Sequence, residues 1–312
     1  MLIRAAMTLV PDRIDVRTAR LDTGLTMTYY YAEPAAEREG TQQEKRAPIV
    51  FIHGTFHAGW CWATFFMPFF ASRGYPCYAI SLRGTSESQP THPSEPPPRS
   101  VKVDEHVRDG VCFLESVVKQ PAVLIGHSFG GLYVMKLMES ERVTARACVT
   151  LCSVPPSGNG QMIMRFFRNR GIGIVVQITL GILFKRAARD IDTCRSLFFA
   201  EDDDLSAIEA YMTRFKADSE CSLDVRDLNA RLPSLKVCPD TKRALWMERA
   251  RVPALVIGAV GDQIVDEMGV VETAAYFGVE PVMFDASLPH DVMLSKRWEL
   301  VARGVHGFLN VH

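Results

Sequence analysis

Short, continuously apolar runs alternate with amphipathic segments over most of the chain. These runs lie at residues 48–53, 76–81, 122–127, 147–153, 253–259 and 281–284. Runs that are apolar throughout are typical of strands buried on both faces of a sheet, as in parallel sheets. Because helix-like segments separate them, the pattern predicts an α/β fold with a mostly parallel central sheet covered by helices on both faces.

The segments between these runs predict the other elements of the core. We expect helices at 63–72, 101–118, 132–138, 267–277 and 294–309. Before the first apolar run, residues 13–20 and 26–32 have β-type composition, and Asp22-Thr23-Gly24 between them predicts an antiparallel hairpin. The polar stretch 33–47 and the proline-rich stretch 90–98 are expected to be loops.

Nearly one hundred residues separate the runs at 147–153 and 253–259, and they lack the alternation of apolar runs and amphipathic segments seen elsewhere. Asp202 to Asp204 are suited to capping a helix whose apolar positions share one face, and residues 172–184 predict a second helix. We therefore expect a core formed by residues 1–155 and 252–312, with a helical cap inserted at 156–251.

Composition excludes several classes of function. In 312 residues, 35 Lys and Arg nearly balance 36 Asp and Glu, and no Lys/Arg-rich run is present. The chain therefore has no broad basic field to attract nucleic acid or an anionic membrane, and we expect no nucleic-acid partner. The run 172–184 is too short to span a membrane, so we expect a buried or interfacial helix and no stable membrane insertion. A homodimer remains an open alternative.

Cysteine spacing and the N-terminus bear on the compartment. The eight cysteines form no C-x-x-C motif and no zinc-type spacing with histidine, which predicts reduced, mostly packed thiols and no metal site. The first 17 residues have an apolar stretch broken by Pro11, which is too brief for a signal peptide. The expected location is cytoplasmic.

A candidate nucleophile lies in Gly126-His127-Ser128-Phe129-Gly130, which matches G-x-S-x-G. The motif follows an apolar strand and precedes a helix-forming run, which is the context of a nucleophile elbow that presents a serine on a strained turn. The bland alternative is that Ser128 only caps the following helix.

A serine nucleophile requires a base and an acid that orients the base. Asp262 follows the run at 253–259 and His290 follows the run at 281–284, so both lie beyond carboxyl ends of predicted strands. Asp266 and Asp285 compete with Asp262 for the acid role, but Asp266 is placed to start a helix. Asp262 itself has the alternative of a turn residue, and His290 that of a surface histidine.

Attack on a carbonyl also requires donors for the oxyanion. Gly54 after the first strand permits a turn that aims the Thr55 N–H at the site, and the Phe129 N–H is the second candidate donor. A plain β-turn at Gly54 is the alternative. His57 fits a ligand-facing role less well than that of a hydrogen-bonded structural histidine.

These segments resemble the α/β-hydrolase superfamily. HGTFHAGWCW at 53–62 is similar to its oxyanion segment, GHSFGG at 126–131 to its nucleophile elbow, GAVGDQIV at 258–265 to its acid segment, and PHDVMLSKRWEL at 289–300 to its histidine segment. The resemblance implies that Ser128, Asp262 and His290 form a catalytic triad, with Thr55 and Phe129 as oxyanion donors and a cap over the nucleophile.

The chain departs from particular branches of that superfamily. Its oxyanion segment is similar to the plant methylesterase and hydroxynitrile lyase branch, but the lyases carry lysine where this chain has Asp291. The cap is also longer than in that branch. Serine at position 128 rather than aspartate argues against the epoxide hydrolases and dehalogenases. Ser81 and Ser86 replace residues usual in the D-x-R-G-x-G-x-S run, so the loop there is expected to differ.

The apolar content of the cap points to the substrate. It exceeds what the closure of a small lid should require, which favours a small hydrophobic substrate, although packing against the sheet explains the excess equally well. Candidate substrate contacts are Phe56, His57, Met162 and Phe166.

We expect a cofactor-independent serine hydrolase that cleaves an apolar carboxylic ester, thioester or lactone through an acyl-enzyme. Two alternatives remain open. One is a C–C bond hydrolase, or a lyase or cyclase of secondary metabolism, that uses the same site. The other is a receptor that retains the triad with negligible turnover.

Overall fold

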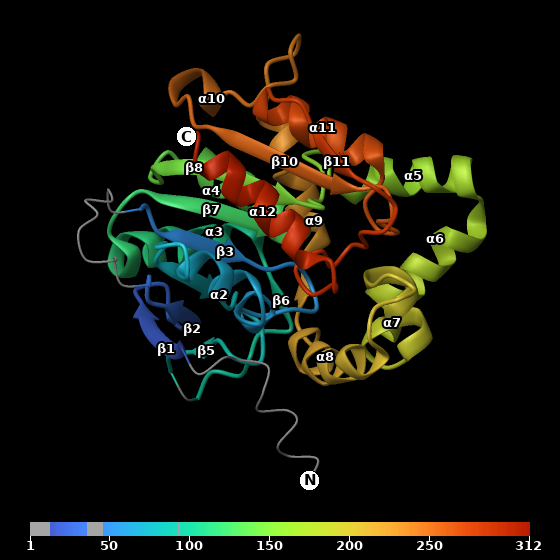
Figure 1. Cartoon of the computed structure of the whole chain (residues 1–312), viewed down its shortest axis with the longest axis horizontal. Helices are drawn as coiled ribbons and strands as arrows, with labels where there is room; N and C mark the ends of the chain where they lie inside the picture. Colours follow the sequence, from blue (N-terminus) through green and yellow to red (C-terminus); the bar gives the residue numbers. More distant parts are fainter. Residues whose placement is uncertain (1–12, 36–45, 93) are drawn as a thin grey trace.

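A mostly parallel sheet forms the centre of the chain in a computed structural model, which describes residues 13–35, 46–92 and 94–312. The strand order is β1-β2-β4-β3-β7-β8-β10-β11, with β5 paired to β2. The pairs β1/β2 and β2/β4 are antiparallel, whereas all pairs from β4 to β11 are parallel. Helices α2 and α12 pack together on one face, and α3 and α4 cover the other (Figure 1). The predicted fold class is confirmed.

The strands and helices have the following bounds. The strands are β1 Ile14–Leu21, β2 Leu25–Ala32, β3 Ile49–Ile52, β4 Cys77–Ile80, β5 Gln89–Pro90, β6 Ser100–Val101, β7 Ala122–His127, β8 Ala145–Leu151, β9 Ser222–Leu223, β10 Ala254–Ala259 and β11 Val282–Phe284. The core helices are α1 Trp60–Ala63, α2 Phe66–Ala71, α3 Val103–Phe113 with the π-helical turn η1 Leu114–Val118, α4 Phe129–Glu139, α11 Glu267–Phe277 and α12 Trp298–Leu309.

Between β8 and β10 the chain is mostly helical, and we call this segment the cap. This segment comprises α5 Asn159–Arg170, α6 Ile172–Ile178, η2 Thr179–Leu183, η3 Arg186–Ala188, α7 Ile191–Phe198, α8 Leu205–Asp218, α9 Val225–Ala230, η4 Pro233–Lys236 and α10 Trp246–Arg249. Asp204 caps α8 by accepting a hydrogen bond from the Ser206 N–H. The two-residue strand β9 pairs with β6 outside the main sheet, and Val237 and Ala244 form an isolated antiparallel bridge.

Two predicted helices have different bounds for identifiable reasons. The segment expected as one helix at 63–72 is split at Phe65, whose φ of −134° leaves the helical region and whose ring stacks on Trp298. The last helix begins at Trp298 rather than at Leu294. The Asp291 carbonyl accepts the N–H groups of Leu294 and Ser295 instead, which forms a turn before the helix.

The apolar run at 172–184 is not a buried helix. It forms α6 followed by the π-helical segment η2, and within it only Gly181 is buried. Met162 and Phe166 on α5 are buried, whereas Met164 and Phe167 beside them are exposed. The apolar surplus of the cap is therefore divided between the core and the protein surface.

Other predictions about the chain have mixed outcomes. All eight cysteines are free, and five of them are buried. No helix in the described part of the chain is long and apolar enough to cross a membrane. The N-terminal 12 residues, on which the signal-peptide argument rests, and most of the expected loop at 33–47 lie outside the described residues.

Two glycines permit the close contact between β3, β7 and α4. A Cβ on Gly126 would lie 2.3 Å from the Gly130 carbonyl oxygen, and a Cβ on Gly130 would lie 2.3 Å from the Ile52 carbonyl oxygen. Both contacts are with backbone, which cannot rotate away. Only glycine therefore fits at these two positions.

We expect Gly130→Ala to lower the free energy of unfolding by about 2–3 kcal/mol, because the new methyl group must displace the backbone of β3. Urea unfolding followed by circular dichroism measures the change. Gly160→Ala is the matched control, since its Cβ would meet nothing within 4 Å and α5 should gain up to about 1 kcal/mol. Equal effects of the two substitutions would contradict the packing argument.

Candidate active site

Ser128 occupies a strained turn between β7 and α4. Its φ is 54° and its ψ is −121°, a conformation that non-glycine residues rarely adopt. Three backbone hydrogen bonds hold the turn: the Ser128 N–H donates to Leu151, and its carbonyl accepts from Gly131 and Val154. The neighbouring strand β8 thus maintains a conformation that is costly by itself.

Asp262 and His290 are brought together from the ends of β10 and β11. The His290 Nδ1–H donates to Asp262 Oδ2 at 2.8 Å, with both side chains almost fully buried. The second oxygen, Oδ1, accepts the N–H groups of Ile264 and Val265 at 2.7 and 2.9 Å, which fixes the carboxylate. Because Nδ1 carries the proton, His290 Nε2 is the nitrogen available as a base.

The two competing aspartates are engaged elsewhere. Asp266 is the N-cap of α11 and binds Arg165 through both carboxylate oxygens. Asp285 accepts a hydrogen bond from the Ser287 N–H. Of the three candidate acids, Asp262 alone is hydrogen-bonded to His290 in the described residues.

The environment of His290 makes it a stronger base. Burial lowers the pKa of His290, but the charge of Asp262, its hydrogen bond and the charge of Asp291 outweigh burial. The net pKa of His290 therefore lies above the usual 6.5.

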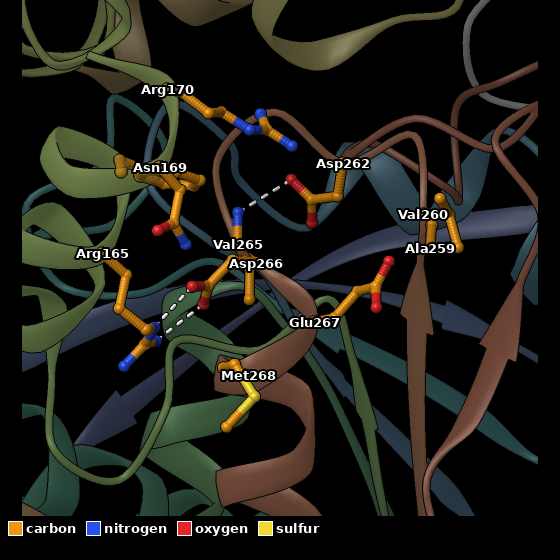
Figure 2. A pocket seen from close by; sticks show the side chains of 11 residues that line it. Arg165, Asn169, Arg170, Ala259, Val260, Asp262, Val265, Asp266, Glu267 and Met268 are labelled. Atoms are coloured by element: carbon orange, nitrogen blue, oxygen red, sulfur yellow. Dashed lines mark hydrogen bonds and ion pairs between the residues drawn. The ribbon is translucent and has the colours of Figure 1, made fainter. Parts of the chain in front are cut away.

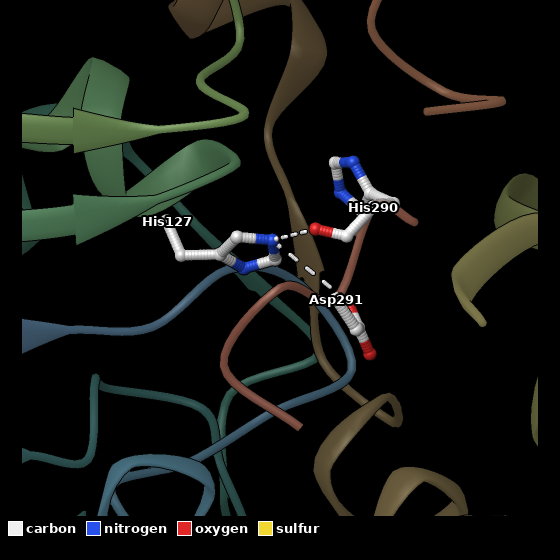
Figure 3. Close-up of side chains that lie close together, drawn as sticks. All are labelled: His127, His290 and Asp291. Carbon is white, nitrogen blue, oxygen red and sulfur yellow. Dashed lines mark hydrogen bonds and ion pairs between the residues drawn. The ribbon is translucent and has the colours of Figure 1, made fainter. Parts of the chain in front are cut away.

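Ser128 and His290 belong to the same cluster without a direct hydrogen bond between their side chains in the described residues. The ring of His127, next to Ser128, has its centroid 4.8 Å from that of His290. Its Nε2–H donates to the His290 carbonyl at 2.9 Å, and Figure 3 shows this ring pointing toward the His290 loop. Burial, together with the charge of His290, lowers the pKa of His127 to about 3, so the ring is neutral.

The expected oxyanion donors lie at the ends of β3 and β7. Phe129 is the first residue of α4, so its N–H has no acceptor within the helix. Thr55 is exposed and follows Gly54, whose Cβ position would lie 2.8 Å from Ser128 Cβ. His53 fixes this turn: its Nδ1–H donates to the Gly54 carbonyl, and its Nε2 accepts from the Leu82 N–H. Burial lowers the pKa of His53 to about 3, which keeps that ring neutral.

His57 forms a buried pair with Asp291. Its Nε2 lies 3.0 Å from Asp291 Oδ2, and its Nδ1 lies 2.7 Å from the Thr55 carbonyl oxygen. Burial raises the pKa of Asp291, but the charge of His57 and their hydrogen bond, with the charges of His127 and His290, lower it below its usual value. Asp291 is therefore ionised. Both ring nitrogens of His57 therefore lie within hydrogen-bonding distance of oxygen atoms.

Asp291 is a site residue whose importance the sequence did not reveal. Its N–H donates to the Phe198 carbonyl in the cap, so one residue joins the His290 loop, the segment after Gly54 and the cap. A lone aspartate after a histidine carries no motif. The signal in the sequence was that a histidine, His57, follows the HG turn and an aspartate, Asp291, follows His290. These two residues come together only in the folded chain.

The four expected substrate contacts are all buried. Phe56 packs against Phe198 and Phe215 of the cap. His57 has both ring nitrogens bound to protein, in keeping with the structural role favoured for it. Met162 and Phe166 lie on the inner side of α5.

A cavity of about 230 Å³ lies between α5 and the start of α11 (Figure 2). Phe166 and Asp262 contribute to its lining, but Ser128 and His290 do not. The Arg165–Asp266 ion pair forms part of its wall, with distances of 2.5 and 2.7 Å. This polar cavity therefore adjoins Asp262 rather than Ser128.

Among the residues that the structure describes, two groups of side chains have the proximity that a metal ion requires: His127, His290 and Asp291, and Cys152, Asp262 and His290. Both include His290, whose Nδ1 is already bound to Asp262. Burial, followed by the charge of Asp262, raises the pKa of the Cys152 thiol well above its usual value, whereas a metal binds the thiolate. The hydrogen bonding thus suits proton transfer better than metal binding.

Comparison with known proteins identifies the family. A model of the Alpha/beta hydrolase family matches residues 49–303. The chain therefore belongs to the alpha/beta hydrolase family, and the resemblance seen in its motifs is confirmed.

Individual relatives are distant. The chain is 27% identical over 119 residues to a carbendazim hydrolyzing esterase of Nocardioides sp. (strain SG-4G), covering 38% of this chain and 47% of that protein. It is 29% identical over 122 residues to norfluorocurarine synthase 1 of Strychnos nux-vomica, covering 38% and 42%. The matches thus span less than half the length of these two curated relatives. The structure of potato (Solanum tuberosum) epoxide hydrolase I is similar with a TM-score of 0.63 and 17% identity, covering 96% of this chain and 100% of that one, which shows the fold alone.

We expect Asp291→Asn to lower the free energy of unfolding by about 3 kcal/mol at pH 7, because it removes a buried carboxylate that pairs with His57 and is stabilised in its ionised form by the surrounding histidines. The pKa of Asp291 is depressed, so the pair stabilises the fold above the unfolded pKa of about 3.9 and loses this effect as the pH falls through the folded value. The difference between wild type and variant in urea unfolding should therefore shrink in acid.

Glu115→Gln is the control for this prediction, since Glu115 pairs with Arg142 on the surface. It should change stability by less than about 1 kcal/mol. A destabilisation by Asp291→Asn that grows as the pH falls would contradict the assigned charge state.

Proposed function

We propose that this member of the alpha/beta hydrolase family is a serine hydrolase of apolar carboxylic esters, thioesters or lactones. The observation that carries the proposal is Ser128 on its strained turn, beside a His290–Asp262 hydrogen bond whose geometry leaves His290 Nε2 free as a base. The esterase named among the relatives supports ester cleavage.

In the proposed reaction the Ser128 proton moves to His290 Nε2 as Oγ attacks the carbonyl carbon. The N–H groups of Thr55 and Phe129 stabilise the oxyanion. His290 then protonates the departing alcohol, which leaves an acyl group on Ser128. Water, deprotonated by His290, attacks this acyl group, and the returned proton regenerates Ser128 with release of the acid. The gap between the Ser128 and His290 side chains closes as substrate binds, as is common for catalytic hydrogen bonds.

The proposal is tested with p-nitrophenyl esters of graded chain length and a fluorophosphonate probe. The wild type should hydrolyse the esters, with a preference for longer acyl chains, and should be labelled by the probe. Ser128→Ala should lose labelling and reduce kcat by about 10³-fold or more, because the attacking oxygen is absent. Ser153→Ala, which alters a nearby hydroxyl bound to the Val154 carbonyl, is the control. Labelling of Ser128→Ala equal to that of wild type would refute the proposal.

The pH profile tests His290 as the base. Since attack needs neutral His290 and its pKa lies above 6.5, kcat/KM should rise with pH along a limb centred above pH 6.5. Asp262→Asn removes the charge and the hydrogen bond that raise this pKa. The limb should then move to lower pH, with a loss of kcat of about 10³–10⁴-fold.

Asp285→Asn is the matched control for that profile, because its carboxylate is bound to Ser287 rather than to His290. It should leave the limb in place. A limb that moves equally in both variants would show that general surface charge, and not Asp262, sets the titration.

A non-hydrolytic step at the same site is the second candidate, because one of the relatives is named a synthase. Turnover in ¹⁸O-labelled water distinguishes the two. Hydrolysis through an acyl-enzyme places one labelled oxygen in the released acid, whereas a lyase or cyclase step leaves the product unlabelled.

A further inference from the structure

The first helices of the cap present large apolar side chains to solvent. The exposed residues are Ile163, Met164, Phe167, Ile172, Val176, Leu180, Leu183 and Phe184, which we call the cap apolar face. Ile172, Val176 and Leu180 follow one another at four-residue intervals and so share one side of their helix. Concentrations of exposed apolar residues of this kind usually mark an interaction surface.

The cap apolar face is separate from the side of the helices that the protein core covers. Ile174, Val175 and Ile178 of α6 are partly buried and pack against the core. Figure 1 shows α5 and α6 as an arm at the edge of the molecule, away from the sheet. The helices therefore have one apolar side that packs against the protein core and a second apolar side that is exposed to solvent.

Charge in this part of the cap is strongly one-sided. Residues 157–189 contain six Arg and Lys residues and no Asp or Glu, although the whole chain has a net charge of −1. Arg165 is neutralised by Asp266, but Arg168, Arg186 and Arg189 are exposed. Arg186 has a weak partner in Asp190 at 3.7 Å, just beyond the segment. These cations thus lie next to residues of the cap apolar face along the chain.

Exposed apolar side chains together with nearby cations favour some kinds of partner over others. A second copy of the chain would bring its own cations against these, and like charges facing one another oppose association. Nucleic acid would engage the cations but leave the apolar side chains in water. A bilayer with anionic headgroups satisfies both, because its acyl boundary accepts apolar side chains while its headgroups attract Lys and Arg.

We propose that the cap apolar face binds the surface of anionic lipid bilayers, with its apolar side chains entering the headgroup boundary and without spanning the membrane. The proposal is independent of the ester hydrolysis argued above. It adds a peripheral binding surface to a chain whose overall charge is nearly neutral.

Sedimentation with vesicles of phosphatidylcholine, with or without phosphatidylglycerol, tests the proposal. The full-length protein should bind the vesicles that contain phosphatidylglycerol, and binding should weaken with added salt. Ile172→Ser/Leu183→Ser/Phe184→Ser should reduce partitioning by about tenfold or more, because three exposed apolar anchors are removed. Arg168→Gln/Arg186→Gln/Arg189→Gln should do the same by removing charge.

Val225→Ser/Leu235→Ser/Leu300→Ser is the matched control, since these three side chains are equally exposed but lie on other elements. It should bind vesicles as wild type does. All variants change exposed residues, and circular dichroism checks that each is folded.

Three results would overturn the proposal. One is a lack of binding to anionic vesicles by wild type, and another is equal loss in the control and the face variants. The third is a dimer, measured by analytical ultracentrifugation, that dissociates in the apolar variant while vesicles are not bound, which would assign the face to a second copy. Hydrolysis of a soluble short-chain ester should be unchanged in all variants, so a failure of membrane binding is distinguishable from a failure of the proposed enzyme.

Discussion

The close backbone contact between β3, β7 and α4 is the constraint on which the site depends. Gly126 and Gly130 leave no room for a Cβ, so the turn that carries Ser128 lies directly against the carbonyl ends of β7 and β3. The hydrogen bonds from Ser128 to Leu151 and from Val154 to Ser128 then hold a positive φ that a serine would not keep alone. The sheet thus holds Ser128 in this conformation, and the turn at Gly54 lies next to Ser128 because β3 is adjacent to β7.

Around that contact, a buried network of histidines and aspartates joins loops that are far apart in sequence. Asp291 links the His290 loop to His57 after the Gly54 turn and, through its N–H, to Phe198 of the cap. His127 links the turn of Ser128 to the His290 carbonyl. Asp291 pairs with His57, and Asp262 pairs with His290. Displacement of one loop would therefore leave a buried carboxylate in another loop without its partner. The network therefore favours one arrangement of the site and ties the cap to it.

The sequence predicted the features that depend on local pattern or on residue order. Buried parallel strands have continuous apolar runs, the elbow has its glycines, and Asp262 and His290 follow strand ends, so the fold and the meeting of Asp262 with His290 could be anticipated. The His57–Asp291 pair could not, because 234 positions separate the two residues and no local pattern marks either. The start of α12 was missed for a similar reason, since the turn before it is formed around Asp291 and the side chain of Ser295 is bound to Asp203 of the cap.

The net charge and apolar content of the whole chain do not reveal the charged and apolar surface of the cap. A net charge of −1 argues against a broad basic field, yet residues 157–189 contain six Arg and Lys residues and no Asp or Glu, and of these Arg165 and Arg186 pair with Asp266 and Asp190 outside the segment. Screening limits the field of an exposed charge to about 10 Å, so a partner at the cap responds to these cations and not to the sum. The apolar content behaves in the same way: part of it packs inward with Phe166, and part is exposed at Phe167 one residue later. The proposed lipid contact and the proposed apolar substrate therefore rest on different parts of the same apolar content, the first on its exposed side chains and the second on its buried ones.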